Sequence, residues 1–284
     1  MVLYQTNLKG IVIKKSITSI AIGGFDGMHL AHQQLFLHLD KNSGIVVIQT
    51  QYANLTPNYK RKEHTNHEIF FYPLEDIKHL NGVEFLDLLV EEFPRLEKIV
   101  VGYDFHFGHK ALNDTDDLKN IFKGEVVVVE EFKKDDISIH SRVIRENIRD
   151  GDIKKANSLL GYNYKIEGLR VAGQGLGSKQ FVPTVNIEVE DFLLPKDGIY
   201  VTKTIINNKI FNSVTFIGHR VTTDGKFAVE THIIDEDFCE DISYKISIIF
   251  LKKIRDNMKF KIYDDLKKQI LKDIDDAKSW FIVN

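Results

Sequence analysis

The part of the sequence that most constrains the fold is the stretch of residues 20–35. It opens with a short apolar run, Ile20 to Ile22, which is typical of a buried strand. The steps Gly23-Gly24 and Asp26-Gly27 follow and let the backbone turn sharply. Apolar residues then return at helical spacing, at Leu30, Leu35, Phe36 and Leu39. The stretch therefore predicts a strand, a tight turn and a helix.

Two histidines, His29 and His32, stand three residues apart in the predicted first turn of this helix. Free backbone N–H groups and the positive end of the helix dipole converge where a strand, a turn and a helix meet, which favours anions. Imidazoles beside such a corner can donate hydrogen bonds to phosphate oxygens and stabilise charge as it builds up. The corner is therefore a candidate phosphate site.

The two halves of the chain have different patterns. In the first half, apolar strand-like runs near residues 44–48, 69–72, 98–102 and 126–129 alternate with helical segments, which predicts a doubly wound parallel sheet of the Rossmann-like kind. From Tyr162 onward, strand follows strand until one amphipathic helix over residues 260–281, and Asn207-Asn208 suits a hairpin turn. This pattern predicts a six-stranded antiparallel β-barrel with a closing helix. We expect two domains, residues 1–161 and 162–284.

Charge and composition exclude several classes of protein. The net charge of −3 provides no basic footprint for nucleic acid. No apolar run is long enough to cross a bilayer, and no cleavable leader is expected at the N-terminus. We therefore expect a cytoplasmic protein that does not bind a membrane. No motif implies an obligate protein partner. The single Cys239 can form no internal disulfide. The basic run at residues 60–62 is interpreted as a solvated loop in preference to a phosphate clamp.

A glycine-rich segment in the second half is a second candidate phosphate site. Alternate glycines let a backbone approach phosphate closely, and a lysine adds charge; the residues are Gly173, Gly175, Gly177 and Lys179. Residues 183–186 follow and read Pro-Thr-Val-Asn.

These motifs, in this order, resemble those of the bacterial bifunctional riboflavin kinase/FAD synthetases over nearly the whole chain. Residues 23–33 fit the frame G-x-F-D-G-x-H-x-x-H-Q of the adenylyltransferase module, and residues 101–108 and 139–152 are similar to later segments of that module. Residues 183–186 resemble the riboflavin kinase signature. Glu230, in an otherwise apolar strand, stands where that family has its catalytic glutamate.

For the first half, the resemblance implies transfer of an adenylyl group from ATP to FMN, which gives FAD and pyrophosphate. The implied catalytic residues are His29, His32 and Arg145. The implied phosphate-binding residues are Gly23, Phe25, Asp26, Gly27, Ser141 and Arg142, and the implied flavin-binding residues are Asp104, Phe105 and Phe107.

For the second half, the resemblance implies phosphorylation of riboflavin by ATP. Glu230 would be the base, and Thr184 and Asn186 would hold Mg²⁺ and the ATP phosphates. The glycine-rich segment would contact phosphate, while Arg220, Arg255 and Phe260 would border the flavin.

Three alternatives remain open from the sequence. The chain departs from the family frame at Ala31, His140 and Arg142, so it could make FMN only and carry a degenerate first module. The first half could instead be a transferase for a different nucleotide or a different acceptor. A non-catalytic flavin-binding regulatory protein is the third alternative, although such a protein needs neither magnesium ligands nor a base.

Overall fold

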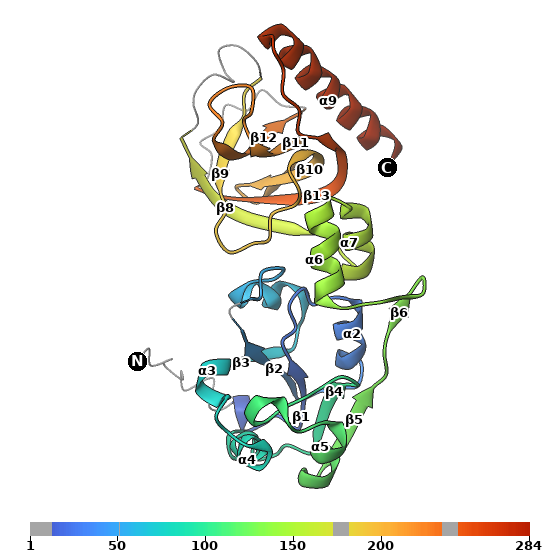
Figure 1. Cartoon of the computed structure of the whole chain (residues 1–284). Helices are drawn as coiled ribbons and strands as arrows, with labels where there is room; N and C mark the ends of the chain where they lie inside the picture. Colours follow the sequence, from blue (N-terminus) through green and yellow to red (C-terminus); the bar gives the residue numbers. More distant parts are fainter. Residues whose placement is uncertain (1–12, 51, 173–181, 235–243) are drawn as a thin grey trace. The chain divides into compact units, whose positions relative to one another are not determined.

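The computed structural model describes residues 13–50, 52–172, 182–234 and 244–284. The chain forms two compact units, Met1–His140 and Ser141–Asn284 (Figure 1). Helices α6 (Ser141–Asp150) and α7 (Ile153–Leu160) belong to the second unit by packing. Asn157 in α7 donates a hydrogen bond from Nδ2 to the Phe250 carbonyl at 2.9 Å. The predicted functional boundary after residue 161 stays a prediction.

Within its described residues, the first unit contains a five-stranded parallel sheet in the order β3-β2-β1-β4-β5. Its strands are β1 (Ser19–Gly23), β2 (Ser43–Gln49), β3 (Glu68–Pro73), β4 (Lys98–Gly102) and β5 (Glu125–Val129). The strand order reverses between β1 and β4, and ligands of such sheets bind beyond the carboxyl ends of the strands at this point. The residues that follow β1 and β4 are those that the sequence singled out.

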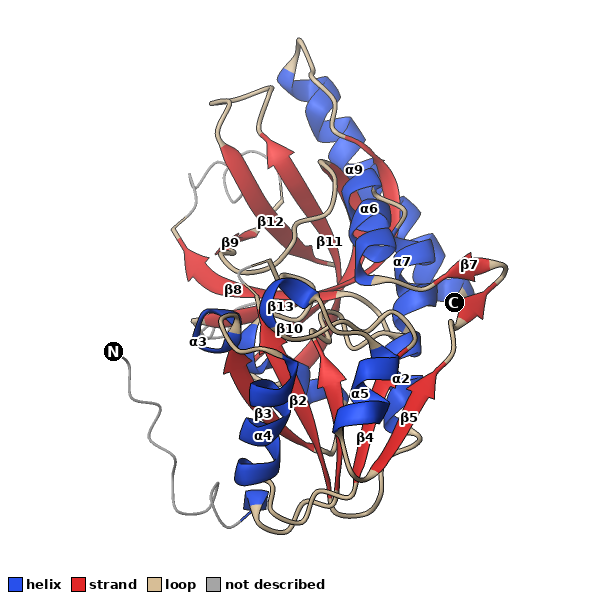
Figure 2. Cartoon of the chain, turned by 60° about the horizontal axis from the view of Figure 1, so that its bottom comes forward, coloured by secondary structure: helices blue, strands red, loops and turns tan. Residues whose placement is uncertain are grey.

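Helices cover both faces of this sheet, as predicted (Figure 2). Because side chains alternate along a strand, Ile20 and Ile22 pack in the core cluster that contains α4 and α5, while Ala21 packs in the cluster that contains α2. The remaining elements of this unit are α2 (Leu30–Phe36), α3 (Leu74–Ile77), α4 (Gly82–Glu92), α5 (Thr115–Ile121), the 3-10 segments η1 (Asn58–His64) and η2 (His109–Ala111), and the short strands β6 (Lys133–Lys134) and β7 (Ile137–Ser138).

The second unit is a closed barrel in the order β10-β11-β12-β9-β8-β13, which confirms the second predicted architecture. Its strands are β8 (Lys165–Val171), β9 (Val185–Glu188), β10 (Gly198–Ile206), β11 (Lys209–His219), β12 (Phe227–Ile233) and β13 (Lys245–Asp256). Asn207 and Asn208 turn the β10–β11 hairpin with φ of 51° and 63°, a conformation that asparagine tolerates well. Helix α9 (Tyr263–Val283) packs Ile274 and Ala277 against Ile199 and Val214. None of the described helices combines the length and apolar character that a bilayer crossing needs.

The barrel interior contains a ring of five fully buried hydroxyl groups. They belong to Thr202, Thr204, Ser213, Thr215 and Thr231, each 0% exposed. Each hydroxyl lies 2.8–3.0 Å from two others, so the ring closes on itself. A hydroxyl can donate one hydrogen bond and accept others, and the ring therefore satisfies polar groups that would be costly to bury alone.

We expect the substitution Thr204→Val to lower the free energy of unfolding by about 1–3 kcal/mol, because it leaves the hydroxyls of Ser213 and Thr231 each short of one buried partner. Urea unfolding followed by circular dichroism measures this change. The control is Thr50→Val, at an exposed position, which should change the value by less than about 0.5 kcal/mol. Equal values for the two variants would contradict a stabilising ring.

Candidate functional site

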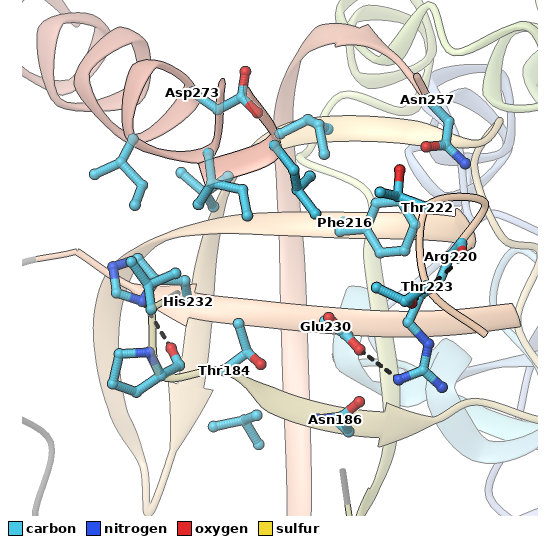
Figure 3. A pocket seen from close by; sticks show the side chains of 18 of the residues that line it. Thr184, Asn186, Phe216, Arg220, Thr222, Thr223, Glu230, His232, Asn257 and Asp273 are labelled. Carbon is cyan, nitrogen blue, oxygen red and sulfur yellow. Dashed lines mark hydrogen bonds and ion pairs between the residues drawn. The ribbon is translucent and has the colours of Figure 1, made fainter. Parts of the chain in front are cut away.

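A cavity of about 610 Å³ lies on the outer face of the barrel, between strands β9, β11 and β12 and helix α9 (Figure 3). Residues predicted from distant parts of the sequence all line it: Thr184, Asn186, Arg220, Glu230, Arg255 and Phe260. The fold thus brings the second-half site residues together. The predicted phosphate residues Gly173, Gly175, Gly177 and Lys179 lie outside the described residues.

Glu230 occupies the middle of the polar wall of the cavity. Strand pairing sets it beside Asn186 on β9 and Phe216 on β11, and Figure 3 shows these side chains on either side of it. Its side chain is 21% exposed and receives a hydrogen bond from Arg220 Nη1 at 3.1 Å. Burial raises the pKa of Glu230, and the Arg220 guanidinium opposes this rise. A carboxylate with a raised pKa is a stronger base once it is ionised.

Two arginines that border the cavity are held by carboxylates. Arg220 Nε lies 3.2 Å from Asp224 Oδ1, in addition to its contact with Glu230. Arg255 binds Asp273 of α9 through two hydrogen bonds, from Nε at 2.9 Å and from Nη2 at 2.7 Å. This forked pair attaches α9 to the barrel beside the cavity. The predicted flavin contacts of Arg220 and Arg255 remain predictions.

Thr184 and Asn186 supply oxygen atoms to the cavity wall close to Glu230. Asn186 is the second residue of β9, and Thr184 directly precedes the strand. Mg²⁺ is commonly held by one or two protein oxygens together with substrate phosphates and water. The donor set therefore fits a magnesium ion bound with a nucleotide. The described residues contain no cluster of three His, Cys, Asp or Glu side chains suited to a metal.

In the first unit, His29 and His32 form a stacked pair after β1. Their ring centroids lie 3.4 Å apart with an angle of 19° between the ring planes. His29 is the N-cap of α2, and its Nδ1 accepts a hydrogen bond from the His32 backbone N–H at 3.4 Å. Burial, followed by the nearby charge of His29, lowers the pKa of His32 well below its ordinary value of 6.5. The buried Nδ1 of His32 has no partner among the described residues.

The turn between β1 and α2 is fixed by a buried carboxylate and a buried guanidinium. Asp26 accepts hydrogen bonds from the backbone N–H groups of residues 54–56 at 3.0–3.3 Å. Arg61 is 1% exposed and donates to the carbonyls of Gly24, Phe25 and Asn58, each at 3.2 Å. The interpretation of residues 60–62 as a solvated loop was therefore wrong for Arg61. Asp26 is directed at protein backbone, so its predicted phosphate contact has no support from this geometry.

The predicted flavin residues after β4 have unequal positions. Asp104 is exposed, whereas Phe107 is 6% exposed and belongs to a core cluster that also contains Phe85. The rings of Phe105 and Phe107 are stacked with centroids 5.6 Å apart. The ring of Phe107 thus packs in the core, and Asp104 is the most accessible of the three to a ligand. Phe25, after β1, is likewise buried and contacts the His32 ring edge-on.

Three further predicted residues start helix α6, which belongs to the second unit. The helix begins at Ser141 itself. The exposed Arg142 lies 3.2 Å from Glu146 one turn along the helix, and Arg145 is partly buried. The phosphate-binding roles of Ser141, Arg142 and Arg145 stay predictions.

Comparisons with known proteins find relatives that match both units of the chain. The family described as riboflavin kinase matches residues 160–281. Bifunctional riboflavin kinase/FMN adenylyltransferases from Listeria monocytogenes and Haemophilus influenzae are each 29% identical to this chain. These matches cover 92% and 93% of this chain and 92% and 94% of the relatives. Over nearly its whole length the chain is similar to the bifunctional riboflavin kinase/FMN adenylyltransferases. A solved structure described as a macrolide-efflux protein from Streptococcus pneumoniae has a similar fold, with a TM-score of 0.81, 28% identity and coverage of 93% of this chain and 95% of that one.

Some residues at the two candidate sites were not predicted from the sequence. Arg61 lies in the basic run of residues 60–62, a pattern that is typical of solvent-exposed residues. Asp273 carried a detectable signal, because it is an acidic residue at helical spacing from Ile270 and Ala277 on the apolar face of α9. His232 lines the cavity two residues after Glu230 and carried no signal of its own.

We expect Arg61→Met to lower the free energy of unfolding by about 2–4 kcal/mol, since three backbone carbonyls lose their buried donor. Urea unfolding measures the loss. The matched control is Lys62→Met at the next position, where the side chain is 52% exposed, and its effect should stay below about 0.5 kcal/mol. The importance of Arg61 for this turn would be refuted by a variant as stable as the control.

The lowered pKa of His32 predicts a loss of stability in mild acid. Below pH 6.5 the unfolded chain binds a proton at this histidine and the folded chain does not, so stability falls with pH until the folded-state pKa is reached. Between pH 7.5 and pH 5.5, we expect the free energy of unfolding of His32→Gln to fall by about 1 kcal/mol less than that of the parent chain. Urea unfolding at both pH values tests this difference; identical losses would show that His32 titrates normally.

Proposed function

We propose that this protein makes FAD from riboflavin in two ATP-dependent steps. The second unit transfers the γ-phosphoryl group of ATP to the 5′-hydroxyl of riboflavin, which gives FMN and ADP. The first module transfers the adenylyl group of a second ATP to FMN, which gives FAD and pyrophosphate. The observation that carries the proposal is that Glu230, Thr184 and Asn186 line one cavity. The relatives of the chain also match it over both units. Matches of that extent favour the two-step function over a kinase alone.

In the kinase step, Glu230 accepts the proton of the riboflavin hydroxyl as the hydroxyl oxygen attacks. Its burial supports this role because burial raises the pKa of the carboxylate, while the Arg220 guanidinium opposes the rise. Thr184 and Asn186 are the residues that would hold Mg²⁺, which neutralises charge on the phosphates when it is bound. The apolar side chains of Val214, Phe216 and Ile270 supply a surface on which a flavin ring can pack.

In the adenylyl step, His29 and His32 stabilise the charge on the phosphate group that is attacked. Support comes from the position of the histidine pair at the carboxyl end of β1, where the strand order reverses. A neutral His32 can donate one hydrogen bond from its ring without carrying a charge into the site. No covalent intermediate with the enzyme is required. The cytoplasmic location stays part of the proposal.

The test supplies purified protein with ATP, Mg²⁺ and either riboflavin or FMN, and separates the flavins by chromatography. FAD from both substrates supports two working modules. FMN from riboflavin with no FAD from either substrate would leave a kinase beside an inactive first module. No product from either substrate would refute the proposed function and favour a flavin-binding protein.

We expect variants to separate the two steps. Glu230→Gln should lower the rate of FMN formation from riboflavin by about 10²–10⁴-fold, because the base is lost, and leave FAD formation from FMN unchanged. His32→Ala should lower FAD formation from FMN by at least about 10²-fold and leave FMN formation unchanged. Each variant is the control for the other. Full FMN production by Glu230→Gln would remove the base assignment.

A further inference from the structure

His232 is a polar residue of the kinase cavity for which the proposed chemistry gives no role. It stands two positions after Glu230 on β12, so both side chains project from the outer face of the barrel into the same cavity (Figure 3). The intervening Thr231 faces the interior and belongs to the hydroxyl ring. His232 is partly buried.

The imidazole of His232 binds the backbone directly before a proposed magnesium ligand. Its Nδ1 lies 2.8 Å from the carbonyl oxygen of Pro183. A carbonyl oxygen can only accept a hydrogen bond, so Nδ1 carries the proton and donates it. The Pro183 carbonyl is part of the rigid peptide unit that leads to Thr184.

This hydrogen bond continues the connection between two strands beyond the end of their ladder. The pairing of β12 with β9 consists of Glu230 with Asn186 and Thr231 with Val185. Residues 183 and 184 precede β9 and lie beyond this ladder. The His232 side chain therefore connects the segment that carries Thr184 to the strand that carries Glu230.

We propose that His232 is a positioning residue of the kinase site, which fixes the Pro183–Thr184 peptide and thereby the direction of the Thr184 hydroxyl toward magnesium and the ATP phosphates. The proposal rests on the proposed kinase function. His232 acts through Thr184 and takes no proton from the substrate. Its loss should consequently weaken the use of Mg²⁺ and ATP and leave the use of riboflavin largely intact.

The experiment compares His232→Asn with His232→Gln in the full-length protein. The Asn side chain places an amide donor close to the position of Nδ1, whereas the Gln side chain places it close to that of Nε2. We expect His232→Gln to raise the KM for ATP and the Mg²⁺ concentration for half-maximal FMN formation by about tenfold, the worth of one hydrogen bond. The KM for riboflavin should stay within about twofold. His232→Asn should restore the parent values to within about threefold.

Two further measurements make the outcome decisive. An unchanged KM for riboflavin reports that the barrel of each variant is folded, and FAD formation from FMN by the other module, which should equal that of the parent chain, is the control for protein concentration. In a Thr184→Val background, His232→Gln should raise the KM for ATP and the Mg²⁺ requirement by less than about a further twofold. The reason is that the effects of residues that act through one another are not additive. Equal Mg²⁺ and ATP dependence in the Gln, Asn and parent proteins, or fully additive effects, would overturn the positioning role. Absence of FMN formation by the parent chain would instead refute the proposed kinase function.

Discussion

Closure of the barrel by β13 is the constraint on which the second unit depends. This strand pairs antiparallel with both β10 and β8, so the sheet has no free edge. Register shifts near Tyr200 and Thr202 interrupt the regular β10–β13 pairing, and such irregularities bend a strand as closure requires. The interior is filled by side chains, and the cavity lies on the outer face against α9. The Arg255–Asp273 pair joins α9 to the barrel beside that face.

The two candidate sites use buried charge in different ways. After β1, the charged side chains of Asp26 and Arg61 form hydrogen bonds with backbone groups. These bonds fix a turn in which Phe25 and Met28 have positive φ values of 47° and 40°. Such strained backbone persists only where the surroundings hold it. In the kinase cavity, the charges of Arg220 and Glu230 face each other and the cavity. At the first site the charged side chains therefore fix the shape of the backbone. At the second, burial and the Arg220 guanidinium act in opposite directions on the pKa of Glu230.

The sequence predicted the architecture well because patterns local to the chain determine it. The strand and helix alternation, the Asn207-Asn208 hairpin and the amphipathic face of α9 each follow from spacing within a short segment. The gathering of Thr184, Asn186 and Glu230 in one cavity could also be expected, because they stand in recognisable motifs. What could not be predicted depends on contacts between distant segments. Arg61 is buried by a turn more than thirty positions earlier, and Phe107 is held in the core by α4.

The hydroxyl ring of the barrel has a consequence for how this protein can change over generations. If one member is replaced by an apolar residue, its two neighbours each lose a hydrogen-bond partner. If the whole ring is replaced by apolar residues of similar shape, no buried hydroxyl remains without a partner. The five positions are therefore coupled, and single steps from the polar to the apolar arrangement pass through less stable proteins. Drift at these sites should be confined to exchanges between serine and threonine. A lineage that crosses to an apolar interior would need several substitutions to become fixed together.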